Sequence, residues 1–233
     1  MRQVLSNIQV SGLAESIYRS GYSMMAEAPS QETFREEVLN IIDSIQLYKL
    51  TKHSSNRHIK RAIALAKKCG GEDQFLTGIR ASFDLSFTIK AWVEAERYKF
   101  LDFITSQSTI HRINKMDVKS CCVKEVDPRI IDILQEKIDT YNNDKTRENF
   151  LKIAYNIPTG FVLTAGMDTN YRCLKNMCTQ REDHMIEDWR LFCEEVKQLP
   201  MAKELIFGNK GDWENEVHVN VQKPWFDDWS RAI

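Results

Sequence analysis

The amino-acid sequence predicts an α/β fold, and three observations support this prediction. Residues 82–92 alternate apolar and polar side chains, which is the period of a strand with one buried face. A second alternation, from Phe161 to Met167, follows Pro158. Elsewhere apolar residues recur at intervals of three and four, as in amphipathic helices. Because the chain has 233 residues and no internal repeat, we expect a single domain over residues 1–233.

Helix signals account for most of the remaining sequence. A helix is expected after Ser30, and another from about Arg57 that ends at Gly70 and Gly71, where glycine permits the left-handed cap. Asp127 before Pro128 is typical of a capped helix start. Further helices are expected at about 146–155, from Asn170, and over 186–196, where Trp189 is interpreted as a core residue.

The weaker segments are assigned by composition. Residues 96–103 have helical character, and the polar stretch 105–109 is interpreted as a loop or helix end. Since two strands make a marginal sheet, further strands are expected from the N-terminal segment or from residues 110–125. The tail, residues 200–233, carries three tryptophans and is expected to dock on its own or a neighbouring subunit; these are Trp213, Trp225 and Trp229.

Composition excludes several classes of function. Lysine plus arginine (32) nearly balance aspartate plus glutamate (33), which disfavours nucleic acid and membrane surfaces as partners. No segment resembles a signal peptide or a membrane span, so a cytoplasmic protein is expected, in the host cytoplasm if the source is viral. The six cysteines lack regular spacing and are interpreted as free thiols, and no metal site is expected. The nearest metal pattern, Cys173, Cys178, His184 and Cys193, is poorly spaced.

The segment 157–190 carries the strongest functional signal. A strand leads into a helix whose first turns contain Asn170, Arg172 and Asn176. Unpaired N–H groups at a helix start can hold a phosphate, and arginine adds a two-pronged donor for the same anion. Asn176 lies on the same helical face as Arg172, whereas Arg181 lies about half a turn away. Alternatively, Arg172 and Arg181 pair with Glu182 or Asp183 on a solvated face.

This segment resembles the flavin-dependent thymidylate synthase family. In that family a Leu-Pro precedes a strand, and twelve residues after the proline Asn-x-Arg-Ser-Leu begins a helix that ends in another arginine. The corresponding residues here are Ile157-Pro158, Asn170-Tyr171-Arg172-Cys173-Leu174 and Arg181, and Glu187-Asp188-Trp189-Arg190 is similar to the Gln-x-Glu-Ile-Arg that follows. The resemblance is best over residues 80–195.

The family's Arg-His-Arg-x-x-Ser signature is degenerate in this chain. In register it falls on residues 103–108, where Ser108 matches, and Lys115 keeps a charge of the second half. Neighbouring cationic and polar residues are expected to compensate. The candidate catalytic residues are Ser108, His111 and Arg112. The candidate substrate-binding residues are Arg181, Arg97, Ser106, Gln107, Lys115 and Arg190. The resemblance assigns flavin contacts to Asn170, Arg172 and Asn176.

The resemblance also implies a fold and an activity. It implies an α+β domain with a central, mostly antiparallel sheet flanked by helices, and a homotetramer with sites at subunit junctions. It implies one-carbon transfer from methylenetetrahydrofolate to C5 of dUMP, with FAD as cofactor and NADPH as reductant. The sequence leaves two alternatives open. One is a pyrimidine nucleotide hydroxymethylase of the same family, and the other is a catalytically silent nucleotide-binding or scaffold homologue.

Overall fold

A four-stranded antiparallel sheet forms the centre of the molecule. The computed structural model describes residues 2–51, 55–68 and 70–208, so the tail tryptophans lie outside the described residues. The strand order is β1-β2-β4-β3, with every neighbouring pair antiparallel. The strands are β1 (Leu5–Ser11), β2 (Arg80–Thr88), β3 (Asp102–Ser106) and β4 (Val162–Asn170). The predicted antiparallel α+β architecture is confirmed.

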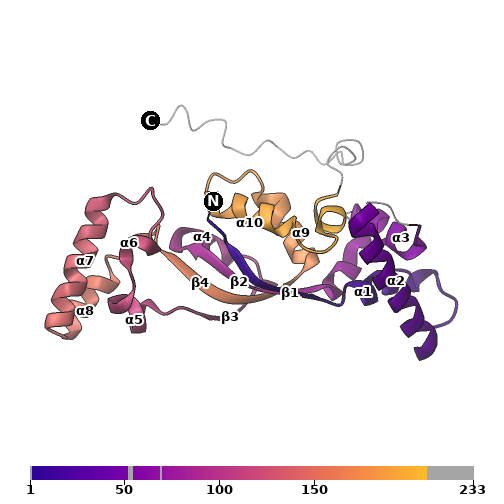
Figure 1. Cartoon of the computed structure of the whole chain (residues 1–233), viewed down its shortest axis with the longest axis horizontal. Helices are drawn as coiled ribbons and strands as arrows, with labels where there is room; N and C mark the ends of the chain where they lie inside the picture. The colour runs from indigo at the N-terminus through magenta and orange to yellow at the C-terminus, as the bar shows by residue number, and fades with distance from the viewer. Residues whose placement is uncertain (1, 52–54, 69, 209–233) are drawn as a thin grey trace.

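Three helices cover one face of this sheet: α4 (Ile89–Ala95), α9 (Tyr171–Arg181) and α10 (Glu187–Val196) (Figure 1). The covered face of β2 carries alternate apolar residues, among them Phe83 and Phe87. The Phe87 ring lies 4.8 Å from that of Trp189, and both side chains are fully buried. Trp189 is therefore a core residue, as predicted. The opposite face of the sheet carries half-buried polar side chains such as Ser82 and Ser86.

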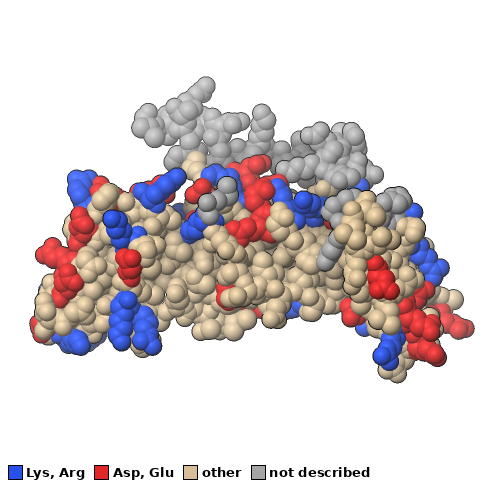
Figure 2. Space-filling model, viewed as in Figure 1, with Lys and Arg blue, Asp and Glu red and all other residues tan. Residues whose placement is uncertain are grey.

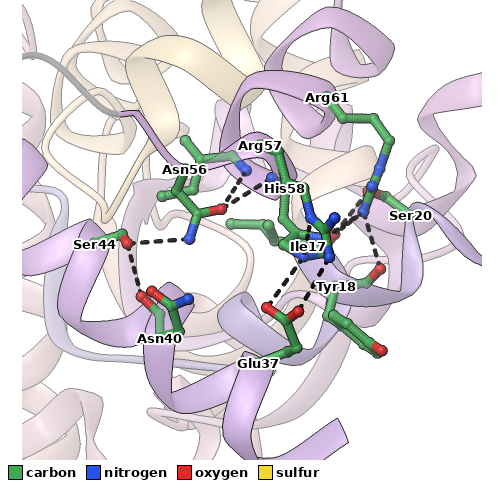
Figure 3. A network of polar contacts seen from close by, with 11 residues as sticks. Ile17, Tyr18, Ser20, Glu37, Asn40, Ser44, Asn56, Arg57, His58 and Arg61 are labelled. Atoms are coloured by element: carbon green, nitrogen blue, oxygen red, sulfur yellow. Dashed lines mark hydrogen bonds and ion pairs between the residues drawn. The ribbon is translucent and has the colours of Figure 1, made fainter. Parts of the chain in front are cut away.

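A second group of helices packs at one end of the sheet. It contains α1 (Leu13–Arg19), α2 (Gln31–Thr51) and α3 (Arg57–Ala66), with a 3-10 turn at Tyr22–Met24 (Figure 1). Arg61 joins α3 to α1, because its Nη2 donates to the carbonyl oxygens of Ile17 and Tyr18 in the last turn of α1 (Figure 3). A cation at the C-terminal end of a helix also interacts favourably with the helix dipole.

His58 lies at the centre of the same network and is buried. Its Nδ1 is 2.9 Å from Nη2 of Arg61, and a guanidinium can only donate, so Nδ1 is the acceptor. The other ring nitrogen, Nε2, lies 3.3 Å from a carboxylate oxygen of Glu37 and 3.3 Å from Nε of Arg57. Burial, followed by the nearby charge of Arg61, lowers the pKa of His58. The neutral imidazole therefore links α2 to α3 (Figure 3).

The opposite end of the sheet carries α5 (Thr109–Arg112), a 3-10 turn (Ile113–Lys115), α6 (Val118–Cys121), α7 (Pro128–Asn143) and α8 (Arg147–Ala154). We call this group the distal lobe; Figure 1 shows it extending away from α9 and α10. It has a hydrophobic core of its own. The buried side chains of that core are Ile113, Val118, Leu134, Ile138, Ile153 and Phe161.

Most predicted helices are confirmed, together with their caps. Ser30 accepts a hydrogen bond from the backbone N–H of Thr33 at the start of α2, and Asp127 caps α7 as predicted. The expected N-terminal strand is β1. The predicted end of the second helix is wrong, because α3 ends at Ala66; Gly71, at φ 106°, instead precedes the 3-10 helix η2 (Glu72–Gly78).

Two other expectations are corrected, and a third is met by only one of the two segments that it named. The strand expected over residues 82–92 ends at Thr88, whose side chain accepts from the N–H of Ala91 and begins α4. The helical character expected through residue 103 is interrupted, because residues 102–106 form the edge strand β3. Residues 110–125 add no strand, only an isolated bridge between Cys122 and Phe161. For β3, pairing with the distant strand β4 overrides the local pattern.

The surface matches the balanced charge of the sequence. Figure 2 shows acidic and basic side chains at both ends of the molecule in this view. Among the described helices, none has the length and apolar character that a membrane crossing requires.

Candidate functional site

A cavity of about 860 Å³ lies beside the first turns of α9. It contains four of the predicted site residues: Arg97, Asn170, Arg172 and Asn176. The antiparallel register of β2 and β4 places Arg80 beside Asn170, and the segment after α4 contributes residues 97–100. Its volume is within the range of small-molecule sites. A second cavity of about 450 Å³, near Tyr48 and Phe207, contains none of the predicted residues.

Asn170 turns the end of β4 into the start of α9. Its Oδ1 accepts a hydrogen bond of 3.0 Å from the backbone N–H of Cys173, as an N-cap residue does. Among the described residues, Nδ2 of Asn170 has no hydrogen-bond partner. The side chain therefore stabilises the helix with its oxygen and retains its two N–H donors at the cavity.

Arg172 is held by the 3-10 helix η2. Its Nε lies 3.3 Å from Oδ1 of Asp73, and its Nη1 donates to the side-chain oxygen of Gln74. Within the described part of the chain, Nη2 has no partner and keeps both N–H donors. The alternative interpretation, in which Arg172 pairs with Glu182 or Asp183, does not hold, because the counterion of Arg172 is Asp73 of a different element.

Asn176 lies one turn further along α9 on the same face as Arg172, as its spacing predicts. Its Oδ1 accepts a hydrogen bond of 3.1 Å from Nε2 of Gln180. The acceptor end of this amide is thus occupied, whereas the donor end has no partner among the residues that the structure describes. Asn170, Arg172 and Asn176 therefore all offer donors, and the cavity is suited to a ligand rich in hydrogen-bond acceptors.

The lining of the cavity is predominantly cationic. Arg97 and Lys99 are exposed and make no ion pair among the described residues. Arg80 pairs with Asp168 of β4, and buried Lys175 pairs with Asp73 at 2.8 Å. Since acidic side chains match only some of these cations, the uncompensated positive charge favours an anion.

Arg181 does not reach the cavity. Its side chain is only 7% exposed, and Nη1 lies 3.1 Å from a carboxylate oxygen of Glu94. The guanidinium carbon lies 4.9 Å from the Trp189 ring centre, and Nε donates to the hydroxyl of Tyr98 at 2.9 Å. His184, whose pKa is lowered chiefly by burial, completes the cluster, with Nε2 at 2.7 Å from Nη1. The alternative pairing of Arg181 with Glu182 or Asp183 does not hold either, since its counterion is Glu94.

The remaining predicted residues lie at the other end of β3 or on α10. The strand starts beside the cavity, with Asp102 paired to Asp168, and ends with Ser106 paired to Ala165. The four residue-to-residue steps from Asp102 to Ser106 span roughly 13 Å. Beyond that point lie Gln107, Ser108, His111, Arg112 and Lys115. Arg190 is exposed on α10 and donates to the carbonyl oxygens of His184 and Met185.

We call the residues beyond β3, namely Gln107, Ser108, His111, Arg112 and Lys115, the distal group. Two of them have structural roles. Ser108 caps α5 by accepting from the backbone N–H of His111 at 3.2 Å. The side chain of Gln107 accepts from the N–H of Thr164 at 3.0 Å and so extends the pairing of β3 with β4. His111, Arg112 and Lys115 are exposed. Within one chain, the structure does not bring this group to the cavity.

The cysteines of α9 and α10 do not form a metal centre. Within the described residues there is no group of three or more metal-ligating side chains. Cys173 lines the cavity, whereas Cys178 and Cys193 are buried side by side between the helices. Burial and the neighbouring Cys193 thiol raise the pKa of Cys178. All five described cysteines are free thiols.

Comparisons with known proteins identify the fold. No protein-family model matches the chain, and no curated protein matches its sequence. Two solved structures of flavin-dependent thymidylate synthase from Helicobacter pylori, both with FAD and dUMP, superpose on it at TM-scores of 0.62 and 0.63. The alignments cover 88% of this chain and 98% and 97% of those chains. This chain has the same fold. Sequence identity is 11% in both comparisons, so the likeness extends to architecture alone.

Several residues that line the cavity were not predicted from the sequence. They include Asp73, Arg80, Tyr98 and Lys99. Arg80 could have been found by pairing the two predicted strands in antiparallel register, which sets it opposite Asn170. Asp73 could not have been found in this way, because its partner on α9, Lys175, is about a hundred residues away in the sequence.

Proposed function

We propose that the chain is a nucleotide-binding flavoprotein that transfers a one-carbon unit from methylenetetrahydrofolate to C5 of dUMP. The observation that carries the proposal is the cluster of donors at the start of α9, on Asn170, Arg172 and Asn176, that have no partner among the described residues. It occurs in a fold whose solved examples contain FAD and dUMP. The family resemblance of the sequence assigns flavin contacts to the same three residues.

The donor set of the cavity fits a dinucleotide such as FAD. A pyrophosphate presents only acceptor oxygens, and it would meet Nη2 of Arg172 and the two amide groups at a helix start. Arg97 and Lys99, which make no ion pair among the described residues, would attract the negatively charged ligand. The exposed ring of Phe100 offers an apolar surface for a planar group.

The residues divide between two ligands. We assign Asn170, Arg172 and Asn176 to FAD and Arg97 to the phosphate of dUMP, and the charge of Arg97 would also attract FAD at longer range. Arg181 lies behind Tyr98, so its predicted contact with the nucleotide would require Tyr98 to move. When bound, FAD would supply the redox step that converts the transferred carbon to a methyl group, with NADPH as reductant. The chain's own part is to orient the pyrimidine and to hold its phosphate.

The distal group would complete the site from another copy of the chain. We propose a homotetramer in which Ser108, His111 and Arg112 of one copy approach the cavity of another. Two features support this: β3 is an edge strand, and it exposes 58% of Phe103 and 63% of Ile104. Exposed apolar edges are surfaces on which chains associate. Light scattering of the purified chain would give its oligomeric state.

The decisive experiment is an FAD titration followed by a turnover assay. Oxidised flavin that co-elutes with the protein is the expected result, followed by a methylated product when dUMP, methylenetetrahydrofolate and NADPH are added. A chain that excludes FAD at millimolar concentration contradicts the flavin assignment. Mass spectrometry of the nucleotide product then identifies the reaction.

A pyrimidine nucleotide hydroxymethylase is the second candidate. The observation that favours it is the degenerate signature segment, residues 103–108, where folate and pyrimidine would meet. A product carrying a hydroxymethyl group would establish this activity. Binding of FAD and dUMP without turnover would instead identify a catalytically silent homologue.

A further inference from the structure

A chain of three side-chain hydrogen bonds leads from buried Arg181 to the cavity. Nε of Arg181 donates to the hydroxyl of Tyr98 at 2.9 Å. That hydroxyl donates to Oε1 of Gln180 at 3.0 Å. Nε2 of Gln180 donates to Oδ1 of Asn176 at 3.1 Å. Two of these four side chains, Tyr98 and Asn176, line the cavity.

The direction of every bond in this chain follows from its first member. A guanidinium can only donate, so the Tyr98 oxygen must accept from Arg181. The hydroxyl proton of Tyr98 then needs an acceptor, which is Oε1 of Gln180. The amide of Gln180 is thereby oriented with its nitrogen toward Asn176. If Gln180 were turned round, the Tyr98 proton would have no acceptor among the described residues.

Arg181 is a fixed starting point for this sequence of bonds. Its side chain is buried, paired to Glu94 and stacked on Trp189. The indole N–H of Trp189 donates to the same carboxylate oxygen of Glu94 at 3.0 Å, which holds the acid in place. A buried cation that is paired and stacked in this way cannot reverse the polarity of the bonds that depend on it.

We propose that Arg181, Tyr98 and Gln180 are positioning residues that fix the amide of Asn176 with its nitrogen toward the cavity. The cavity then accepts a ligand with a hydrogen-bond acceptor at that point and rejects one with a donor there. This inference rests on the proposed function, because FAD is taken as the ligand. Arg181 acts at the site through these bonds rather than by contact with the ligand.

The substitution Gln180→Glu tests the proposal. A carboxylate at this position accepts from Tyr98 but cannot donate to Asn176, so the Asn176 amide turns its nitrogen toward the new carboxylate and its oxygen toward the ligand. FAD affinity should fall by about tenfold. Gln180 and Asn176 are both exposed, so the variant should fold normally, which thermal unfolding would check. Unchanged FAD affinity in Gln180→Glu would overturn the proposal.

A double-mutant cycle separates positioning from the added charge. In an Asn176→Ala background there is no amide to turn, so Gln180→Glu should lose most of its effect on FAD affinity. If the new carboxylate acts only by repelling the ligand, Gln180→Glu weakens binding equally in both backgrounds. Equal effects would therefore contradict the proposal.

A measurement without ligand keeps the inference separate from the proposed function. In the ligand-free chain, Tyr98→Phe removes the acceptor for Arg181 and the donor for Gln180. The side-chain NH₂ resonances of Gln180 and Asn176 should both shift in the nitrogen–proton NMR spectrum. Tyr155→Phe, at an exposed tyrosine outside the cavity, is the matched control. If the chain fails to bind FAD, the flavin proposal fails, and this spectrum alone decides the inference: an unshifted Asn176 signal refutes it.

Discussion

Lys175 Nζ lies 2.8 Å from Oδ2 of Asp73, and the other oxygen of the same carboxylate lies 3.3 Å from Nε of Arg172. The ammonium group also donates to the carbonyl oxygen of Ala66 at the end of α3. Lys175 thus neutralises Asp73 from the buried side. Asp73 can therefore orient Arg172 without cancelling the charge that Arg172 presents to the cavity.

Removal of the buried ammonium should destabilise the protein. In Lys175→Met, Asp73 loses its nearer counterion, and we expect a decrease of about 3 kcal/mol in the free energy of unfolding. This decrease in stability is at the low end of the range for a broken buried ion pair, because Arg172 remains beside Asp73. Lys60→Met, at an exposed lysine of α3, is the control. Urea titrations that give equal stabilities for both variants would refute the buried role.

Loss of the arginine at the cavity should affect binding and leave the fold intact. The Arg172 side chain is 40% exposed, so Arg172→Ala leaves no sealed void. FAD affinity should fall by about 1.5 to 3 kcal/mol, which is roughly 10- to 150-fold. Fluorescence titration measures this, with Arg147→Ala in the distal lobe as control. Unfolding of Arg172→Ala would instead show that the residue is structural.

The exposed cations should make FAD binding sensitive to salt. Arg97 and Lys99 face solvent, where the Debye length falls from about 10 Å at 0.1 M to about 3 Å at 1 M salt. The dissociation constant should therefore rise with ionic strength. Lys99→Ala should weaken binding at low salt and reduce this dependence, whereas Lys145→Ala in the distal lobe should not. A salt-independent affinity would exclude an electrostatic role for these residues.

The buried imidazole of His58 should make stability depend on pH. Because the pKa of His58 is lowered in the folded state, the unfolded chain binds more protons below the ordinary pKa of about 6.5. The contribution of His58 is present above that pH and is lost as the pH falls toward the folded-state pKa. His58→Asn keeps an acceptor for Arg61 without a titrating ring. Its unfolding free energy should decline less between pH 7.5 and 5.5 than that of the unaltered chain. His184, whose pKa is also lowered, contributes the residual slope.

Local patterns in the sequence were sufficient for the two central strands, the N-terminal caps of α2 and α7, and the cavity face of α9. Alternation identified β2 and β4, and the spacing of Arg172 and Asn176 placed both on one side of the helix. The edge strand β3 escaped detection because all five of its residues are exposed, so neither face selects apolar side chains.

The environment of Arg181 depends on contacts that no local pattern records. Its partners Glu94 and Tyr98 precede it by 87 and 83 residues. The helical angle between Arg172 and Arg181 indicated different surroundings, but not that one of them would be buried. For the same reason no sequence pattern indicated the bonds that link Arg181 to Asn176.

The separate core of the distal lobe has a consequence for motion. The fully buried side chains of that core are distinct from those beneath α9 and α10, so the two regions can lose amide protection in separate cooperative openings. Ser108 and His111 lie at the start of α5, directly after β3. The distance of these residues from a ligand would then change with the slow, cooperative opening of the distal lobe rather than with the rapid rotation of single side chains.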